Sequence, residues 1–233
     1  MTREEAANVP TDAIINVNGD SIQALDITLL LVVMTLLPTL VVMMTSFTRY
    51  VVSLSFLRTA MGTQQTPPNM VLVGMALILT LFTMTPTLGN VKTAAYDPYV
   101  AGEITQQEFF DRAQIPLKQF MLRNTELGSM QMYCGMAGEA APTTEEELEA
   151  AVNLPILVIA PAFVTSELKA AFWIGFLLYI PFMLIDVIVS STLMSMGMIM
   201  LPPSMISTPF KILLFILLDG WSLLFSTLIQ TVG

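Results

Sequence analysis

The chain of 233 residues has no histidine and one cysteine. Histidine is the usual general base at neutral pH and the commonest metal ligand, so its absence removes Ser-His and Cys-His catalysis and disfavours most enzyme classes. The single cysteine, Cys134, cannot form an internal disulfide, which excludes a secreted disulfide scaffold. The net charge of −9 disfavours nucleic-acid binding, because phosphates require a basic surface.

Charged residues are also scarce. They make up 12% of the chain, against about 25% in ordinary soluble domains. Apolar residues account for 55%, and the mean hydropathy is +0.73. Such a composition excludes disorder, which needs low hydrophobicity and high net charge. The sequence therefore predicts an integral membrane protein.

The uncharged stretches predict about four hydrophobic spans, each close to the roughly 20 residues that cross a bilayer as a helix. The first covers residues 27–48, and the second covers about 70–88. A third runs from about 170 into the 190s, after a helix start at Ser166, and a fourth covers 210–231. The segment 194–207 contains Gly197 and two prolines, which predict a break at membrane depth.

The same patterns divide the chain into four segments. They are an N-terminal extracytoplasmic segment (1–26), a first hydrophobic helical hairpin (27–91), an acidic helical extracytoplasmic segment (92–149) and a C-terminal hydrophobic region (150–233). The connection 49–69 carries Arg49 and Arg58 and no acid, so the positive-inside rule places it in the cytoplasm. No secretory signal pattern precedes residue 27, which indicates either a removed signal or a targeting role for the first span.

The acidic segment carries local helix signals. Thr105 with Glu108, and Thr144 with Glu147, both fit a capping box, in which the hydroxyl and the carboxylate bond to free backbone N–H groups. Apolar residues recur at helical spacing after the first box, and Pro116 is expected to kink or divide that helix. We expect a small solvated helical subdomain.

Three ionisable residues fall where hydrocarbon is expected: Asp186, Lys211 and Asp219. Each would cost about 2.5–3.5 kcal/mol at a helix centre, so such groups face protein or water. A structural Lys–Asp pair between packed helices is the favoured interpretation. A proton or ion relay is the alternative, and an intramembrane aspartyl protease is disfavoured because the sequences around the two aspartates do not fit its motifs.

Methionines alternate at positions 194, 196, 198 and 200. In an extended segment these side chains would share one face, whereas on a helix they would scatter. Methionine is flexible and polarizable, so a ring of such side chains could seal a conduit and still deform around a passing chain. Core filling and a gate both remain open from the residues alone.

Six motifs stand in order along the chain: MMTSFTR (43–49), GTQQTPPN (62–69), PAFVTSELK (161–169), GMIMLPP (197–203), PFK (209–211) and DGW (219–221). Together they closely resemble the FliP family of flagellar biosynthesis proteins, over about residues 22–231. The resemblance implies an all-α membrane protein built from bent helical hairpins, with no enzymatic activity and no cofactor.

Further expectations follow from this resemblance. It implies the core of the export gate of the flagellar type III secretion apparatus, in the bacterial inner membrane within the flagellar basal body. Several copies, usually five, would assemble with FliR and FliQ, contact FlhB and FlhA, and conduct unfolded flagellar proteins. The main alternative is a small-ion or proton transporter that uses Asp186, Lys211 and Asp219.

The resemblance also implies roles for particular residues. The gate or gasket would comprise Met196, Met198, Ile199 and Met200, with isoleucine at a position that is typically methionine in the family. Charged contacts between helices or subunits would involve Glu167, Lys169, Asp186, Lys211 and Asp219. The cytoplasmic-side loop would use Arg49, Arg58, Gln64, Gln65, Pro67 and Pro68.

Overall fold

The computed structural model describes residues 14–17, 20–63, 65–198 and 200–232. The chain divides into two units, Met1–Val42 and Met43–Gly233. In the first, strands β1 (Ile14–Val17) and β2 (Asp20–Gln23) pair antiparallel, an addition to the expected all-α fold. Helix α1 (Ala24–Met43) follows and contains Pro38. The first expected span is therefore helical but ends at Met43.

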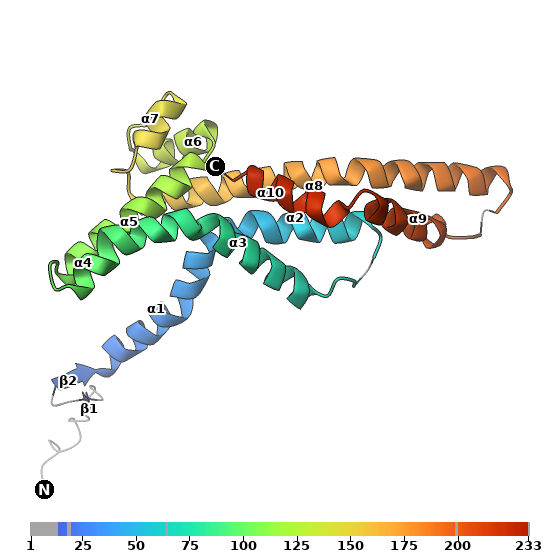
Figure 1. Ribbon diagram of the computed structural model, residues 1–233. Coiled ribbons are helices and arrows are strands. Elements are labelled where there is room, and N and C mark those ends of the chain that lie inside the picture. Colours follow the sequence, from blue (N-terminus) through green and yellow to red (C-terminus); the bar gives the residue numbers. More distant parts are fainter. Residues whose placement is uncertain (1–13, 18–19, 64, 199, 233) are drawn as a thin grey trace, which may run out of the picture. The chain divides into compact units, whose positions relative to one another are not determined.

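The second unit is helical throughout its described part, as predicted (Figure 1). Its elements are α2 (Phe47–Ala60), α3 (Asn69–Val91), a π-helical turn (Lys92–Tyr96), α4 (Asp97–Val100), α5 (Gln106–Arg123), α6 (Leu127–Ala137), α7 (Glu145–Ala150), α8 (Ile156–Ser195), α9 (Pro203–Leu217) and α10 (Gly220–Gln230). Helix α2 packs along α8, and α9 returns beside α8 after the turn that follows Ser195.

Two continuous helical stretches of the described chain are long and apolar enough to cross a membrane, namely Asn69–Val100 and Ile156–Ser195. Helices α9 and α10 pass the same test together, but they are bent by 68° where they meet. The expected fourth span is thus a bent pair rather than one straight helix. The expected total of about four spans stays a prediction.

Helix α8 corrects the helix start that was expected at Ser166. It has 40 residues and begins at Ile156, not at Ser166. The hydroxyl of Ser166 donates to the carbonyl of Ala162 inside the helix and accepts the backbone N–H of Glu126, so it does not cap a helix start. Pro161 and Pro181 both lie inside α8, as membrane helices tolerate where neighbours satisfy the freed backbone groups.

The expected connection 49–69 is also corrected, because most of it is helix α2. This helix is too short to span a bilayer, and Tyr50, Leu54 and Leu57 on it are almost completely buried. It packs closely on α8: a Cβ atom added to Gly175 would lie 2.5 Å from the ring of Phe56. The remaining connection is a short loop between α2 and α3.

The capping predictions in the acidic segment are confirmed at Thr105, where both reciprocal bonds with Glu108 are present. At Thr144 the hydroxyl accepts the N–H of Glu147, but the Glu147 carboxylate bonds to Thr143 instead. Helix α5 runs unbroken through Pro116, so the expected division there does not occur. Helices α5 and α6 pack on α8 around the buried rings of Phe120 and Phe163.

Candidate functional site

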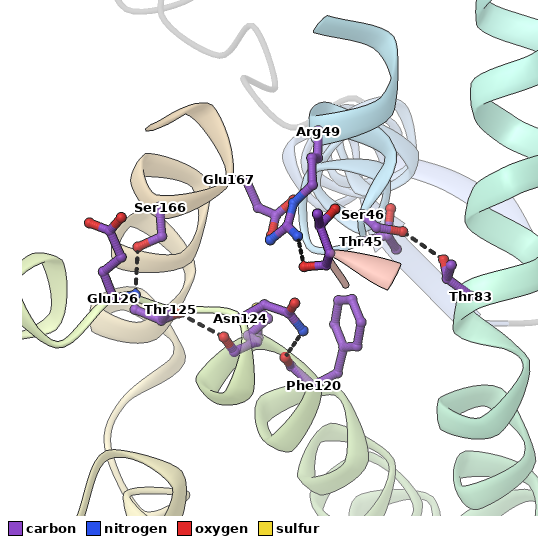
Figure 2. Close-up of polar contacts among 12 residues, drawn as sticks. Thr45, Ser46, Arg49, Thr83, Phe120, Asn124, Thr125, Glu126, Ser166 and Glu167 are labelled. Carbon is purple, nitrogen blue, oxygen red and sulfur yellow. Dashed lines mark hydrogen bonds and ion pairs between the residues drawn. The ribbon is translucent and has the colours of Figure 1, made fainter. Parts of the chain in front are cut away.

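Arginine 49 forms a buried ion pair that joins α2 to α8 (Figure 2). Its Nε donates to Oε2 of Glu167 at 2.9 Å, and Nη2 lies 2.5 Å from Oε1. The two side chains are 5% and 0% exposed. The third nitrogen, Nη1, donates to the carbonyl of Thr231 at the end of α10. Arg49 therefore lies in the protein interior rather than in a cytoplasmic-side loop.

Lysine 211 makes a similar connection from α9. Its Nζ donates to Oδ2 of Asp186 at 2.7 Å and to the carbonyl of Ala60 at 3.0 Å. The Ser207 hydroxyl donates to the other carboxylate oxygen at 2.7 Å. Ala60 ends α2, where carbonyl groups lack helical partners and a cation is favourable. The contact neutralises both charges inside one chain.

The two ion pairs follow one scheme. In each, an acid of α8 binds a cation that also bonds to the C-terminal carbonyl of another helix. Glu167 and Asp186 are separated by roughly 28 Å along α8 at 1.5 Å per residue. Helix α8 is consequently held at two points far apart along its length. At Glu167 the partner helices are α2 and α10, and at Asp186 they are α9 and α2. The sequence did not indicate these contacts of Ser207, Ala60 and Thr231, because no local pattern marks a partner so distant in the chain.

Lysine 169 and Asp219 lie apart from these pairs. Lys169 binds Glu126 at 2.9 Å and the hydroxyl of Ser129, with both charged side chains more than half exposed. None of the ion pairs in the described chain involves Asp219. Its backbone is left-handed, with φ 47°, where it joins α9 to α10. Asp186 is thus partnered by a lysine and a serine rather than by a second carboxylate.

The bend at Asp219 explains the motif of residues 219–221. Gly220 is required because a Cβ atom there would lie 2.3 Å from the Phe215 ring. The Trp221 ring packs edge-on against Phe215, with ring centroids 5.2 Å apart. The motif therefore builds a tightly packed corner between α9 and α10.

The methionine turn comprises residues 196–202, between α8 and α9. Helix α8 ends in a Schellman motif, in which Gly197, at φ 74°, follows the last helical turn and Met198 N–H bonds to the carbonyl of Leu193. Met194 and Met196 therefore belong to the helix end, which corrects the expected extended row. Ile199 lies outside the described residues.

The methionine side chains at this turn are nevertheless exposed. The exposed fractions are 69% for Met194, 59% for Met196, 44% for Met198 and 98% for Met200. The turn lies at the far end of the α8–α9 hairpin from α6 and α7 (Figure 1). Flexible apolar side chains thus gather at the hairpin tip with little cover from this chain.

The loop between α2 and α3 is held by Arg58. Its guanidinium donates to the carbonyl of Pro67 at 3.4 Å and to the side chain of Asn69. Gln65 and Pro68 are exposed, and Gln64 lies outside the described residues. Gly62, at the start of the loop, approaches Thr208 of α9, so this loop borders the Lys211 contact.

These features define a helical membrane protein whose long apolar helices are fixed by internal ion pairs. The described residues contain no group of His, Cys, Asp or Glu that could hold a metal ion. The model of the FliP family matches residues 30–228, and the chain belongs to this family.

Similar proteins from several bacteria carry the name flagellar biosynthetic protein FliP. The protein of Aquifex aeolicus is 43% identical over 213 residues, which cover 91% of this chain and 87% of that protein. The protein of Bacillus subtilis is 45% identical, with coverage of 87% and 89%. The protein of Cereibacter sphaeroides is 46% identical, with coverage of 86% and 64%.

Proposed function

We propose that the chain is a core subunit of the flagellar type III protein export gate in the bacterial inner membrane, within the flagellar basal body. In this role it would help to form a channel that conducts unfolded flagellar proteins, without catalysing a reaction itself. Membership of the FliP family and the names of the relatives support a place in flagellum biosynthesis. The long apolar helices support a membrane location.

The observation that carries the channel proposal is the exposed methionine turn at the tip of a braced hairpin. The ion pair of Asp186 with Lys211 connects the two arms of the hairpin, so the tip projects from a defined scaffold. Several copies arranged around an axis would bring Met196, Met198 and Met200 together. Unbranched side chains with low cost of rearrangement could close such a ring and yield to a passing polypeptide.

The exposed apolar surface supports assembly with other subunits. In the most apolar window of α8, only 11% of the residues are buried within the chain. Lipid or protein must cover the rest, because a large exposed apolar surface marks an interaction surface or membrane contact. We propose a homo-oligomer, with five copies expected, together with FliR and FliQ and in contact with FlhB and FlhA.

A leak measurement tests the gate. We expect a Met198→Ala, Met200→Ala double variant, expressed with the other gate subunits, to raise the permeability of the membrane to small solutes, because truncated side chains leave the ring open. Met136→Ala is the matched control, since Met136 is 72% exposed but lies in α6. A double variant as tight as the control would contradict a gasket role for these methionines.

The transporter alternative has less support. Asp186 and Lys211 already neutralise each other, and Asp219 belongs to no ion pair among the described residues. A relay needs titratable groups within hydrogen-bond reach of each other or of bridging water. A selective, saturable ion flux through the purified protein alone would favour the transporter.

A further inference from the structure

Two neighbouring cavities on the second unit have complementary chemistry. The apolar cavity, of about 420 Å³, lies against α8, α9 and α10. Its lining includes Leu57, Phe182 and Leu224, which are nearly fully buried. Among the described residues that line it, the polar groups are the hydroxyls of Thr227 and Thr231 and the indole N–H of Trp173. This volume falls in the usual range for small-molecule sites.

The polar cavity, of about 490 Å³, is lined by the end of α5, by α7, by α8 and by the end of α10. Trp173, Ile174 and Thr231 line both cavities, so the two adjoin each other at these residues. Tryptophan is enriched where a membrane meets water, since its ring is apolar and its N–H is polar. Trp173 thus marks a junction between an apolar and a polar compartment.

Unpaired charges of both signs line the polar cavity. Arg123 is exposed at the end of α5, and Glu145 and Glu149 lie on α7. Of the ion pairs found in the described residues, none involves these three side chains. The other ionised groups around the cavity are compensated, because Arg49 binds Glu167 and Glu126 binds Lys169. Arg123, Glu145 and Glu149 are exposed, and an occupant with one anionic and one cationic group would complement their charges.

We propose that the two cavities together bind one zwitterionic phospholipid of the phosphatidylethanolamine type. Its phosphate binds Arg123, its ammonium group donates to Glu145 and Glu149, and an acyl chain enters the apolar cavity past Trp173. A guanidinium is well suited to phosphate, and a primary ammonium donates several hydrogen bonds to carboxylates. An anionic lipid would offer no cation to the two glutamates.

The dimensions agree with this assignment. The lining residues of the apolar cavity on α8 run from Trp173 to Phe182. At 1.5 Å per residue this is roughly 14 Å. One leaflet contributes about half of the 30 Å hydrocarbon core, so the length of the cavity along α8 is close to the thickness of one leaflet. The inference requires only a membrane location and does not depend on the export-gate proposal.

Native mass spectrometry of the full-length protein tests the headgroup preference. The protein, in its purified oligomeric state, is titrated with dioleoyl lipids that carry ethanolamine, choline or glycerol headgroups. We expect ethanolamine to bind tightest, and Arg123→Gln to weaken its binding roughly tenfold or more, as expected for loss of a charge-assisted hydrogen bond. The double variant Glu145→Gln, Glu149→Gln is expected to abolish the preference for ethanolamine over glycerol.

A photoactivatable phosphatidylethanolamine with a diazirine at the acyl terminus tests the position. Crosslinks are expected on the segments of α8 and α9 that line the apolar cavity, and Thr227→Phe, which places a ring there, should reduce them. In the lipid titration, Lys92→Gln is the control for Arg123→Gln, because it also removes one positive charge. Lys92 contacts Asp97 and does not line either cavity.

Three outcomes would overturn the proposal: equal binding of the three headgroups, an Arg123→Gln variant that binds like Lys92→Gln, or crosslinks confined to other surfaces. Loss of the lipid when the oligomer forms would also overturn it, because a second copy of the chain would then occupy the groove.

Discussion

Loss of the Glu167 carboxylate should be among the most destabilising single changes in this chain. Glu167 is completely buried, and both of its oxygens bond to Arg49. A Glu167→Leu substitution leaves a buried guanidinium that keeps its bond to the Thr231 carbonyl. Removing one partner of a buried ion pair costs about 3–5 kcal/mol, because the other charge stays uncompensated.

The double variant Arg49→Met, Glu167→Leu should recover much of this loss. Replacing both charges with apolar side chains of similar size is often nearly neutral. The Thr231 carbonyl then loses this partner, but Thr231 is exposed, so water can replace the bond at small cost. We therefore expect the double variant to be more stable than Glu167→Leu alone.

The free energy of unfolding can be measured by SDS titration in mixed micelles, followed by the fluorescence of Trp173 and Trp221. Lys169→Met is the matched control, since it breaks an exposed pair on the same helix and should cost under about 1 kcal/mol. A cost of Glu167→Leu no larger than that of Lys169→Met would contradict the buried ion pair. So would a double variant whose cost equals the sum of the costs of Arg49→Met and Glu167→Leu measured singly.

Three smaller changes test local features. Thr105→Ala should cost about 1 kcal/mol through loss of the cap on α5, and a cost equal to zero in thermal unfolding would refute the capping role. Hydrogen bonds from Thr105 lower the pKa of Glu108. The contribution of the Glu108 carboxylate to stability is therefore complete above its ordinary pKa of about 4.3 and is lost as the pH falls through the lowered pKa. Circular dichroism across this acid range should show the stabilities of Thr105→Ala and the parent protein converging. Gly175→Ala should lower the melting temperature because its Cβ meets the Phe56 ring, and an unchanged value would show that the ring yields freely. Asp219→Gly should be tolerated at its positive φ, whereas Asp219→Val should destabilise the corner, and equal stability of the two would argue against the left-handed backbone.

Local signals in the sequence predicted local structure well. The capping box at Thr105 needs only two residues in one turn, and it formed as expected. The uncharged run after residue 69 predicted α3, because hydropathy alone determines a membrane helix of that length. At Thr144 the same pattern was right about the helix start but wrong about the bond partner, because Thr143 offers an equivalent N–H.

Features that depend on distant partners could not be predicted. The sequence suggested a helix start at Ser166, yet α8 starts at Ile156 and contains Glu167 and Lys169. Glu167 is tolerated there because Arg49, far away in the sequence, neutralises it. The positive-inside rule favoured a cytoplasmic loop for Arg49, because a buried partner such as Glu167 cannot be recognised from loop charge.

The alternation of methionines was a misleading signal. A period of two predicts an extended segment. Gly197 instead closes a Schellman motif at the end of α8, so the row spans a helix terminus and a turn. A glycine at this place fits both a break and a helix cap, and only the backbone geometry separates the two.

In the proposed function, this chain is one of several subunits around a shared channel. Native mass spectrometry of the detergent-extracted particle, with and without co-expressed FliQ and FliR, tests it most directly. We predict a discrete homo-oligomer that gains defined copies of both partners. A stable monomer or dimer that binds neither partner would contradict the claim and would favour a self-contained transporter.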